Sequence, residues 1–334
     1  MRGRSPFDCG FFMAERFMFD TYFPLYHGAP LGNADFRCHW DDFVVDEELP
    51  PMDLGAGEHV YLQIRKRGIN TEWLARQLAE RLKIAPNDVG FCGLKDRHAT
   101  TSQWFSLYLP KVKELDGRAL LPEIEGELEL LQQTRGSKKL RRGMHKANHF
   151  VIHLRHYSGC QDAFAARLEL IRQQGVPNYF GEQRFGIEGQ NLLAAKTWLE
   201  EKQRIKRSLE GIYLSSLRSY IFNAILRARL ASAPLEELQT LSGALWGRGR
   251  LPAEYAEFET QALHADLAPL LNALEHKGLN QERRPLWLQV ADLTWQFPGP
   301  DQLQLRFSLA PGQYTTSLLR ESVHLRDMSV KIHS

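Results

Sequence analysis

Residues 91–109 read FCGLKDRHATTSQWFSLYL, and they join a charged turn to an apolar segment. The second part, SQWFSLYL from Ser102 to Leu109, is rich in aromatic and apolar residues and predicts a β-strand. The first part is a glycine-containing turn in which Lys95, Asp96 and Arg97 follow one another. The stretch therefore predicts a sheet in which one strand starts directly after a cluster of charges.

Further strand signals lie on both sides of this stretch. In HVYLQIRK, residues 59–66, and in NHFVIHLR, residues 148–155, apolar and polar side chains alternate as they do in a half-buried strand. Between the first of these and residue 91, Asn70 or Thr71 can cap a helix that ends before Pro86, and its apolar side chains recur every four residues. The first half of the chain is therefore predicted to be a sheet with helices on it.

From about Asp162 the apolar period becomes that of helices. Asp162 can cap a helix that runs to Gln174, with Gly175 as its terminator, and an apolar stripe at helical spacing lies between Leu214 and Ile225. The last 50 residues return to strand character at 286–295, 303–309 and 314–319. Strand-rich flanks around a helix-rich middle predict an insertion in one parent fold, whose C-terminal strands rejoin the N-terminal sheet.

Length and composition indicate a globular protein without a membrane span. The 334 residues are 43% hydrophobic and 25% charged, which is enough for two domains with their own cores. No stretch approaches the roughly 20 consecutive apolar residues that a membrane span needs, and the first residues lack the apolar core of a signal peptide. We therefore expect a cytoplasmic protein, and the widely spaced Cys9, Cys38, Cys92 and Cys160 are expected to be reduced thiols.

Positive charge is concentrated in one stretch. The chain has 42 basic and 40 acidic residues, but residues 130–161 contain no acid and seven of the cations, so the rest of the chain is net negative. Such a local field is typical of a protein that binds a polyanion, because phosphate neutralisation releases counterions. A solvated loop would have the same composition, and charge alone does not separate the two.

Two segments carry candidate chemistry. Asp96 stands between two cations, which favours an ionised carboxylate that acts as a nucleophile or through its charge rather than as a proton donor, although a charged β-turn would look the same. The loop GVPNYFGEQRFG, residues 175–186, holds three aromatic side chains beside Arg184. These rings could stack on nucleic-acid bases or could pack inside the protein and brace a site.

Metal and nucleotide sites are not indicated. His145, His149 and His153 would share one helix face, but the alternation of residues 150–154 predicts a strand there, and the neighbourhood is cationic. The sequence has no GxxxxGK[ST] loop, no GxGxxG after a strand, and neither HExxH nor GxSxG. We therefore expect no metal and no nucleotide cofactor.

Two longer motifs resemble one enzyme family. GLKDRHATTSQ, residues 93–103, resembles the GxKDRxAxTxQ signature of the tRNA pseudouridine-13 synthases, the TruD family, and PNYFGEQRFG, residues 177–186, matches a second signature of that family. Weaker matches are DDFVVDE at 41–47, KANHFVIHLR at 146–155 and APGQYTTSLLRE at 310–321. The two main motifs occur in the family's order, so the chain is identified as resembling that family over nearly its whole length beyond about residue 24.

The resemblance implies an isomerase that converts uridine to pseudouridine in tRNA without a metal or organic cofactor. It implies that Asp96 is the catalytic aspartate, and that Phe43, Asn148 and Phe150 contact the target base. Tyr314 stands where the family usually has phenylalanine, so its ring is expected in the same place with an added hydroxyl. The cations expected to hold the RNA backbone are Lys138, Lys139, Arg141, Arg142 and Lys146. Either Lys95 or Arg97 is expected to pair with Asp96.

The fold class that follows is α/β (α+β), with a mixed, largely antiparallel sheet in the catalytic domain and an inserted, mostly helical domain. We expect the catalytic domain at residues 21–173 and 289–334 and the inserted TRUD domain at 174–288. Residues 1–20 have no recognised counterpart and are expected to be a disordered extension or an artefact of the start site. We expect a monomer whose partner is tRNA.

Two other classes of protein remain open from the sequence. An RNA-binding module without catalysis could use the same basic and aromatic surface, but it has no need of Asp96. A metal-dependent nuclease would need clustered carboxylates, and the sequence does not show them.

Overall fold

The computed structural model describes residues 19–123, 128–201 and 203–329. The chain divides into two compact units. One unit consists of residues 29–173, 290–315 and 322 onward, and we refer to it as the sheet unit. The other consists of residues up to 28 together with 174–289 and 316–321, and we refer to it as the helical unit. Each unit is described by itself below.

The sheet unit is built on one sheet, which has ten strands in the described part of the chain. The strands are β1 (Asn33–Phe36), β2 (Phe43–Glu48), β3 (Leu54–Arg67), β4 (Val89–Phe91), β5 (Thr100–Tyr108), β6 (Leu128–Gly136), β7 (Ala147–Ser158), β12 (Thr294–Gly299), β13 (Gln302–Leu309) and β14 (His324–Asp327). The predicted strands within 59–66, 102–109 and 148–155 are confirmed.

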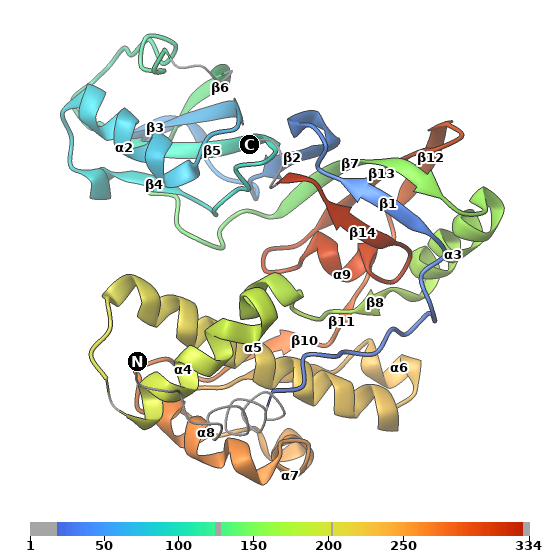
Figure 1. Ribbon diagram of the computed structural model, residues 1–334. Helices are drawn as coiled ribbons and strands as arrows, with labels where there is room; N and C mark the ends of the chain where they lie inside the picture. The colour runs from blue at the N-terminus through green and yellow to red at the C-terminus, as the bar shows by residue number, and fades with distance from the viewer. Residues whose placement is uncertain (1–18, 124–127, 202, 330–334) are drawn as a thin grey trace, which may run out of the picture. The chain divides into compact units, whose positions relative to one another are not determined.

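The order of the main strands is β12-β13-β7-β2-β5-β3-β6, with β4 beside β5 and β1 between β7 and β14 (Figure 1). Most neighbours are antiparallel, but β2 pairs with β5 and β1 with β14 in parallel. The sheet is therefore mixed and largely antiparallel, as predicted. The C-terminal strands do rejoin the N-terminal sheet, because β13 pairs along β7 from Leu303 opposite Leu154 to Leu309 opposite Asn148.

Helix α2 (Thr71–Leu82) covers one face of this sheet, and it begins and ends where the sequence predicts. The side chain of Asn70 accepts hydrogen bonds from the backbone N–H groups of Glu72 and Trp73, which caps the helix. Its buried face, with Leu74 and Leu78, packs on apolar side chains of β3 and β5. A short 3-10 helix (Pro86–Asp88) follows and leads into β4, and another (Trp40–Asp42) leads into β2.

Two expectations about helix ends and strands are wrong. Helix α3 (Gln161–Gln174) starts one residue before the predicted cap, so Asp162 lies in its first turn, while Gly175 with φ 80° ends it as predicted. Residues 315–319, which were expected to be a strand, form helix α9 (Thr315–Leu319). Leu318 and Leu319 are both fully buried, and two adjacent buried side chains do not fit the alternation of a half-buried strand.

The helical unit contains short strands besides its helices. Its elements in the described residues are β8 (Val176–Pro177), 3-10 helices at Glu182–Phe185, Ile187–Gly189 and Ala265–Leu267, α4 (Gln190–Glu200), α5 (Arg207–Ser232), α6 (Leu235–Leu238), β9 (Ser242–Leu245), α7 (Ala253–Gln261), α8 (Ala268–Glu275), β10 (Glu282–Pro285) and β11 (Trp287–Leu288). The predicted apolar stripe is the buried face of α5. None of the helices in the described ranges is long and apolar enough to cross a membrane.

The aromatic loop at 175–186 belongs to the core of the helical unit. Tyr179 and Phe185 are each 1% exposed, and Phe180 packs edge-on against Phe222 of α5 with ring centroids 5.5 Å apart. The interpretation in which these rings pack inside the protein is therefore confirmed.

Of the expected N-terminal extension, residues 1–18 lie outside the described residues. Phe19 packs edge-on against Tyr220, and Asp20 pairs with Arg227 at 2.6 Å. Among the cysteines, Cys38, Cys92 and Cys160 are free thiols.

Candidate active site

The loop that carries Asp96 is held from inside the sheet unit. Thr71, the first residue of α2, accepts a hydrogen bond from the backbone N–H of Lys95 at 3.2 Å and donates to the Gln103 side chain at 2.7 Å. Gln103 in turn donates to the carbonyl of Gly93 at 3.2 Å. Because Thr71 and Gln103 are fully buried, these bonds fix the backbone just before Asp96.

Lys95 points inward and does not pair with Asp96. Its ammonium forms an ion pair with Glu47 of β2, and the other carboxylate oxygen of Glu47 accepts from the backbone N–H of Trp104 at 3.1 Å. The exposed Arg97 donates to the carbonyl of Gly68 at 3.2 Å. The prediction that Lys95 or Arg97 pairs with Asp96 is therefore wrong. The backbone of this loop directs the Lys95 side chain into the core and the Arg97 side chain toward solvent.

The cation that pairs with Asp96 is Arg37, which directly follows β1. Nη1 of Arg37 donates to Oδ2 of Asp96, and the backbone N–H of His98 donates to Oδ1 at 2.8 Å. The Asp96 side chain is 30% exposed and that of Arg37 is 10% exposed. Asp96 is thus a carboxylate with a fixed position, a neighbouring positive charge and one accessible side, which suits a nucleophile or a base.

A row of four phenylalanine rings leads away from Arg37. The guanidinium of Arg37 lies over the ring of Phe36, 5.0 Å from its centroid, and Phe36 packs edge-on against Phe43. Phe43 lies nearly parallel to Phe150 with centroids 6.0 Å apart, and Phe150 lies nearly parallel to Phe307 at 5.3 Å. The structure therefore brings the two predicted base-contacting rings together, and Phe36 connects them to Arg37.

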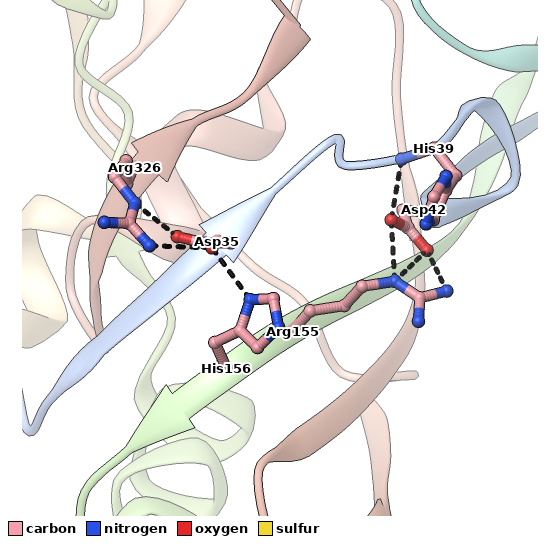
Figure 2. Close-up of polar contacts among 6 residues, drawn as sticks. All are labelled: Asp35, His39, Asp42, Arg155, His156 and Arg326. Carbon is pink, nitrogen blue, oxygen red and sulfur yellow. Dashed lines mark hydrogen bonds and ion pairs between the residues drawn. The ribbon is translucent and has the colours of Figure 1, made fainter. Parts of the chain in front are cut away.

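The start of β2, where Phe43 sits, is fixed by a buried carboxylate. Asp42 is 1% exposed and accepts from the backbone N–H of His39 at 2.9 Å and from Nε of Arg155 at 2.9 Å, as Figure 2 shows. Arg155 of β7 thus uses its charge inside the sheet unit. It is one of the seven cations in the acid-free stretch, and this contact removes it from the set available to a polyanion.

Asn148 lies on β7 two residues before Phe150, opposite Glu47 on β2. Its Nδ2 is 3.0 Å from Nε2 of His145, whereas its Oδ1 is buried and has no hydrogen-bond partner among the described residues. Burial and the nearby Lys95 lower the pKa of His145, so the ring is neutral at pH 7 and Nε2 can accept from the amide. The amide oxygen of Asn148 is then left as an acceptor.

These contacts form one continuous site in the sheet unit. On one side, Asp96 contacts Arg37, and the row of phenylalanine rings continues from Arg37 to Phe150. On the other side, Asn148 of β7 lies opposite Glu47, and Glu47 pairs with Lys95, the neighbour of Asp96 in sequence. Tyr314 lies half-buried directly before α9, and its place in the site stays a prediction.

A buried lysine lies close enough to the site to interact electrostatically with Lys95 and Asp96. Lys66 near the end of β3 has no exposed surface, and its ammonium donates to the carbonyl of Ile69 at 2.7 Å. Burial and, to a smaller extent, the charge of Lys95 lower the pKa of Lys66 to about 7, while the charge of Asp96 acts in the opposite direction. The charge state of Lys66 is therefore tied to the two residues at the centre of the site.

The five cations expected to bind RNA all lie in the connection between β6 and β7. Arg142 pairs with Glu72 at 2.9 Å, Lys146 with Glu48 at 2.7 Å, and Lys139 donates to the carbonyl of Asn87. The exposed side chains of Lys138 and Arg141 make no ion pair with any residue that the structure describes. These two are the cations of the segment that are most available to a phosphate.

The three histidines of the segment do not share a helix, because β7 begins at Ala147. His149 contacts Ser308 and Glu48, and His153 contacts Gln304. In residues 19–123, 128–201 and 203–329 no group of three His, Cys, Asp or Glu side chains is placed to hold a metal ion.

Sequence reasoning missed three members of this site. Arg37 is 59 positions from Asp96 and Glu47 is 48 positions from Lys95, so no local pattern joins them. His145 was considered only as a metal ligand. A charged residue inside an otherwise apolar alternation, such as Glu47 in FVVDE, was the available signal for a buried partner.

The family model for tRNA pseudouridine synthase D (TruD) matches residues 27–196, which include Arg37, Phe43, Asp96 and Asn148. The chain is also 43% identical over 329 residues to a tRNA pseudouridine synthase D from Cellvibrio japonicus, an alignment that covers 94% of this chain and 96% of the relative. The chain belongs to the TruD family. A second TruD protein, from Nitrosococcus oceani, is 42% identical over 89% of this chain and 92% of its own length.

The fold agrees with that of the TruD family. A crystal structure of a protein from Methanosarcina mazei, described as a TruD protein, matches with a TM-score of 0.63 over 90% of this chain and 96% of its own, at 19% sequence identity. The resemblance found in the two sequence motifs is thus confirmed over almost the whole chain. A non-catalytic RNA-binding module is not favoured, because the relatives are named as synthases.

Proposed function

We propose that this protein converts uridine 13 of tRNA to pseudouridine and that Asp96 is the carboxylate that acts on the nucleotide. The reaction class follows from the TruD family: the protein is an isomerase that makes pseudouridine in tRNA. The observation that supports the choice of Asp96 is its contact with Arg37, in a loop fixed by Thr71 and Lys95.

The isomerisation breaks the C1′–N1 bond and forms a C1′–C5 bond. C5 loses its hydrogen as a proton and N1 gains a proton, so the reaction needs no oxidant and no second substrate. Asp96 can attack the base or the sugar, or accept a proton from the sugar, and each route requires an ionised carboxylate.

The base must stay bound while it turns. Rotation of uracil about the line through N3 and C6 exchanges N1 with C5 and one carbonyl with the other, but leaves N3–H where it was. An acceptor facing N3–H can therefore hold the base before and after the turn. The amide oxygen of Asn148 suits that role, and the rings of Phe43 and Phe150 supply apolar faces beside it.

A uridine stacked in a helix cannot reach these groups, so it must be flipped out at a cost of a few kcal/mol. Lys138 and Arg141, with the more weakly available Lys139, Arg142 and Lys146, would hold the neighbouring phosphates. Tyr314 would contact the base from the C-terminal side. We further propose that residues 174–288 of the helical unit are the inserted TRUD domain and that the enzyme works as a monomer in the cytoplasm.

The test is Asp96→Asn, which keeps the shape of the side chain and removes its charge. Release of tritium from C5-labelled uridine in tRNA should fall by several orders of magnitude, while filter binding and the thermal melt stay near those of the wild type. Asp96→Glu should also be strongly impaired, because a displacement near 1 Å can cost about 100-fold. Near-normal release by folded Asp96→Asn would move the catalytic role to another residue.

A further inference from the structure

Arg37 is held at two edges of its guanidinium by two different carboxylates. Nη1 donates to Asp96, while Nε donates to Oδ1 of Asp327 at 3.2 Å and Nη2 donates to Oδ2 of Asp327. The backbone of Arg37 is in the left-handed region with φ 60°, which is uncommon for a residue other than glycine. The chain therefore adopts an unfavourable local conformation at the point where this arginine meets both acids.

Asp327 is placed by the pairing of the last described strand with the first. β14 runs parallel to β1 with Asp327 opposite Phe36, and the backbone N–H of Met328 donates to the carbonyl of Phe36 at 2.9 Å. The backbone N–H of Ser329 also donates to Oδ1 of Asp327 at 3.0 Å. Burial alone would raise the pKa of Asp327, but the bonds from Arg37 and Ser329 outweigh it and the pKa lies below its usual value.

The two-pronged contact decides how Arg37 can meet Asp96. A guanidinium offers parallel N–H pairs that fit both oxygens of one carboxylate. Because Asp327 takes the Nε and Nη2 edge, Arg37 gives Asp96 a single bond to Oδ2, and Oδ1 accepts from the backbone N–H of His98 instead. Without Asp327, Arg37 could turn and bind both oxygens of Asp96, which would cover the group that must reach the nucleotide.

We propose that Asp327 is a positioning residue for pseudouridine formation, acting through Arg37 on Asp96. The proposal depends on the proposed role of Asp96. Asp327 does not touch the nucleotide. It sets the orientation of the Arg37 guanidinium and adds a second negative charge beside it, next to that of Asp96. It lies beyond residues 27–196, the part of the chain that the family model matches.

The same two strands carry a second arginine–aspartate pair, which provides a matched control. Asp35 on β1 lies opposite Arg326 on β14, and Arg326 donates to it from Nε at 2.6 Å and from Nη2 at 2.8 Å (Figure 2). His156 adds a third contact to Asp35 at 2.9 Å. Asp35→Asn therefore removes one charge and one such contact from the same strand pair without touching Arg37 or Asp96.

The experiment compares Asp327→Asn with Asp35→Asn in the full chain, at a temperature where both are folded, with tRNA as substrate. Misplacement of a reacting group by about 1 Å can reduce activity roughly 100-fold. We expect kcat of Asp327→Asn to fall by that factor with KM unchanged within about twofold, whereas Asp35→Asn should lower Tm and leave kcat within about threefold. Asp327→Glu, which restores the charge, should recover part of kcat.

A comparison of kcat with Tm separates positioning from support of the fold. A residue that positions Asp96 through Arg37 should lower kcat in Asp327→Asn by more than the change in Tm accounts for. If Asp327→Asn does not fold, Asp327→Glu is used instead, and it should show reduced kcat with KM unchanged within about twofold.

The outcomes distinguish this inference from the proposed function. An unchanged kcat in Asp327→Asn, together with an inactive Asp96→Asn, would overturn the role of Asp327 alone. Equal losses in Asp327→Asn and Asp35→Asn that follow their Tm values would also overturn it, because both acids would then serve only strand pairing. An active Asp96→Asn would refute the proposed function itself.

Discussion

Lys95 and Glu47 form an ion pair from which solvent is almost excluded, with side chains 5% and 0% exposed. Removing one member of a buried pair leaves an uncompensated charge and typically costs about 3–5 kcal/mol. We therefore expect Lys95→Met and Glu47→Leu each to lower the free energy of unfolding by that order, and the double variant Lys95→Met/Glu47→Leu to be more stable than Lys95→Met alone. Urea denaturation of the four proteins measures the coupling.

The same variants show what the pair does for the reaction. If it holds the loop of Asp96 in place, the stable double variant should still lose activity. Full activity in that variant would limit the pair to a role in folding.

Phe43 is expected to contact the base through its ring. Stacking is worth about 1–3 kcal/mol per base, so Phe43→Ala should lower kcat/KM at least about tenfold, while Phe43→Tyr should keep much of it. Phe307→Leu is the control, because Phe307 ends the same row of rings on the other side of Phe150. A loss that merely follows Tm in all three variants would make Phe43 a core residue.

RNA binding should depend more on Lys138 and Arg141 than on their paired neighbours. Each lost phosphate contact reduces the slope of log K against log salt by about 0.7–0.9. Lys138→Ala/Arg141→Ala should therefore flatten the slope by nearly two such steps, and Lys139→Ala/Arg142→Ala by less, because those two side chains already contact Asn87 and Glu72. Filter-binding titrations at several salt concentrations measure both, and equal slopes in all proteins would exclude this segment from the RNA site.

Lys66 should make stability depend on pH above neutrality. Its pKa is about 7 in the folded protein, whereas an unfolded lysine has its ordinary pKa of 10.5, so between these pH values the unfolded state binds more protons. The free energy of unfolding should therefore gain a contribution that rises from about pH 7 to about pH 10. Denaturation at several pH values should show this rise in the wild type and a flatter profile in Lys66→Met. A parallel rise in the variant would assign it to other groups.

Local patterns predicted most of the elements of the sheet unit. The alternation of Phe150, Ile152 and Leu154 identified β7, and Asn70 located the start of α2, because both signals arise from side chains close in sequence. The prediction of a strand at 314–319 was wrong because threonine and leucine occur in strands as well as in helices. Burial of the adjacent Leu318 and Leu319 favours the helix, and the sequence pattern does not show this burial.

The candidate site was predicted only in part, for a related reason. Asp96, Phe43, Asn148 and Phe150 were named through motifs that each lie within a few residues. The partner of Asp96 was misjudged because Lys95 and Arg97 are adjacent in sequence, whereas Arg37 reaches Asp96 through the pairing of distant strands. Which of several nearby cations faces an acid is set by backbone direction, which charge patterns do not contain.

The pairing of β1 with β14 also has a consequence for the order of folding. Arg37 and Asp327 are 290 positions apart, so their contact closes one of the longest loops in the molecule, and contacts of such separation form slowly because the loss of chain entropy precedes any gain. Helices and local hairpins can form well before that. During folding the chain should therefore pass through a state with nearly complete secondary structure in which Arg37 does not yet contact Asp96. Catalytic activity should be among the last properties that the folding chain acquires.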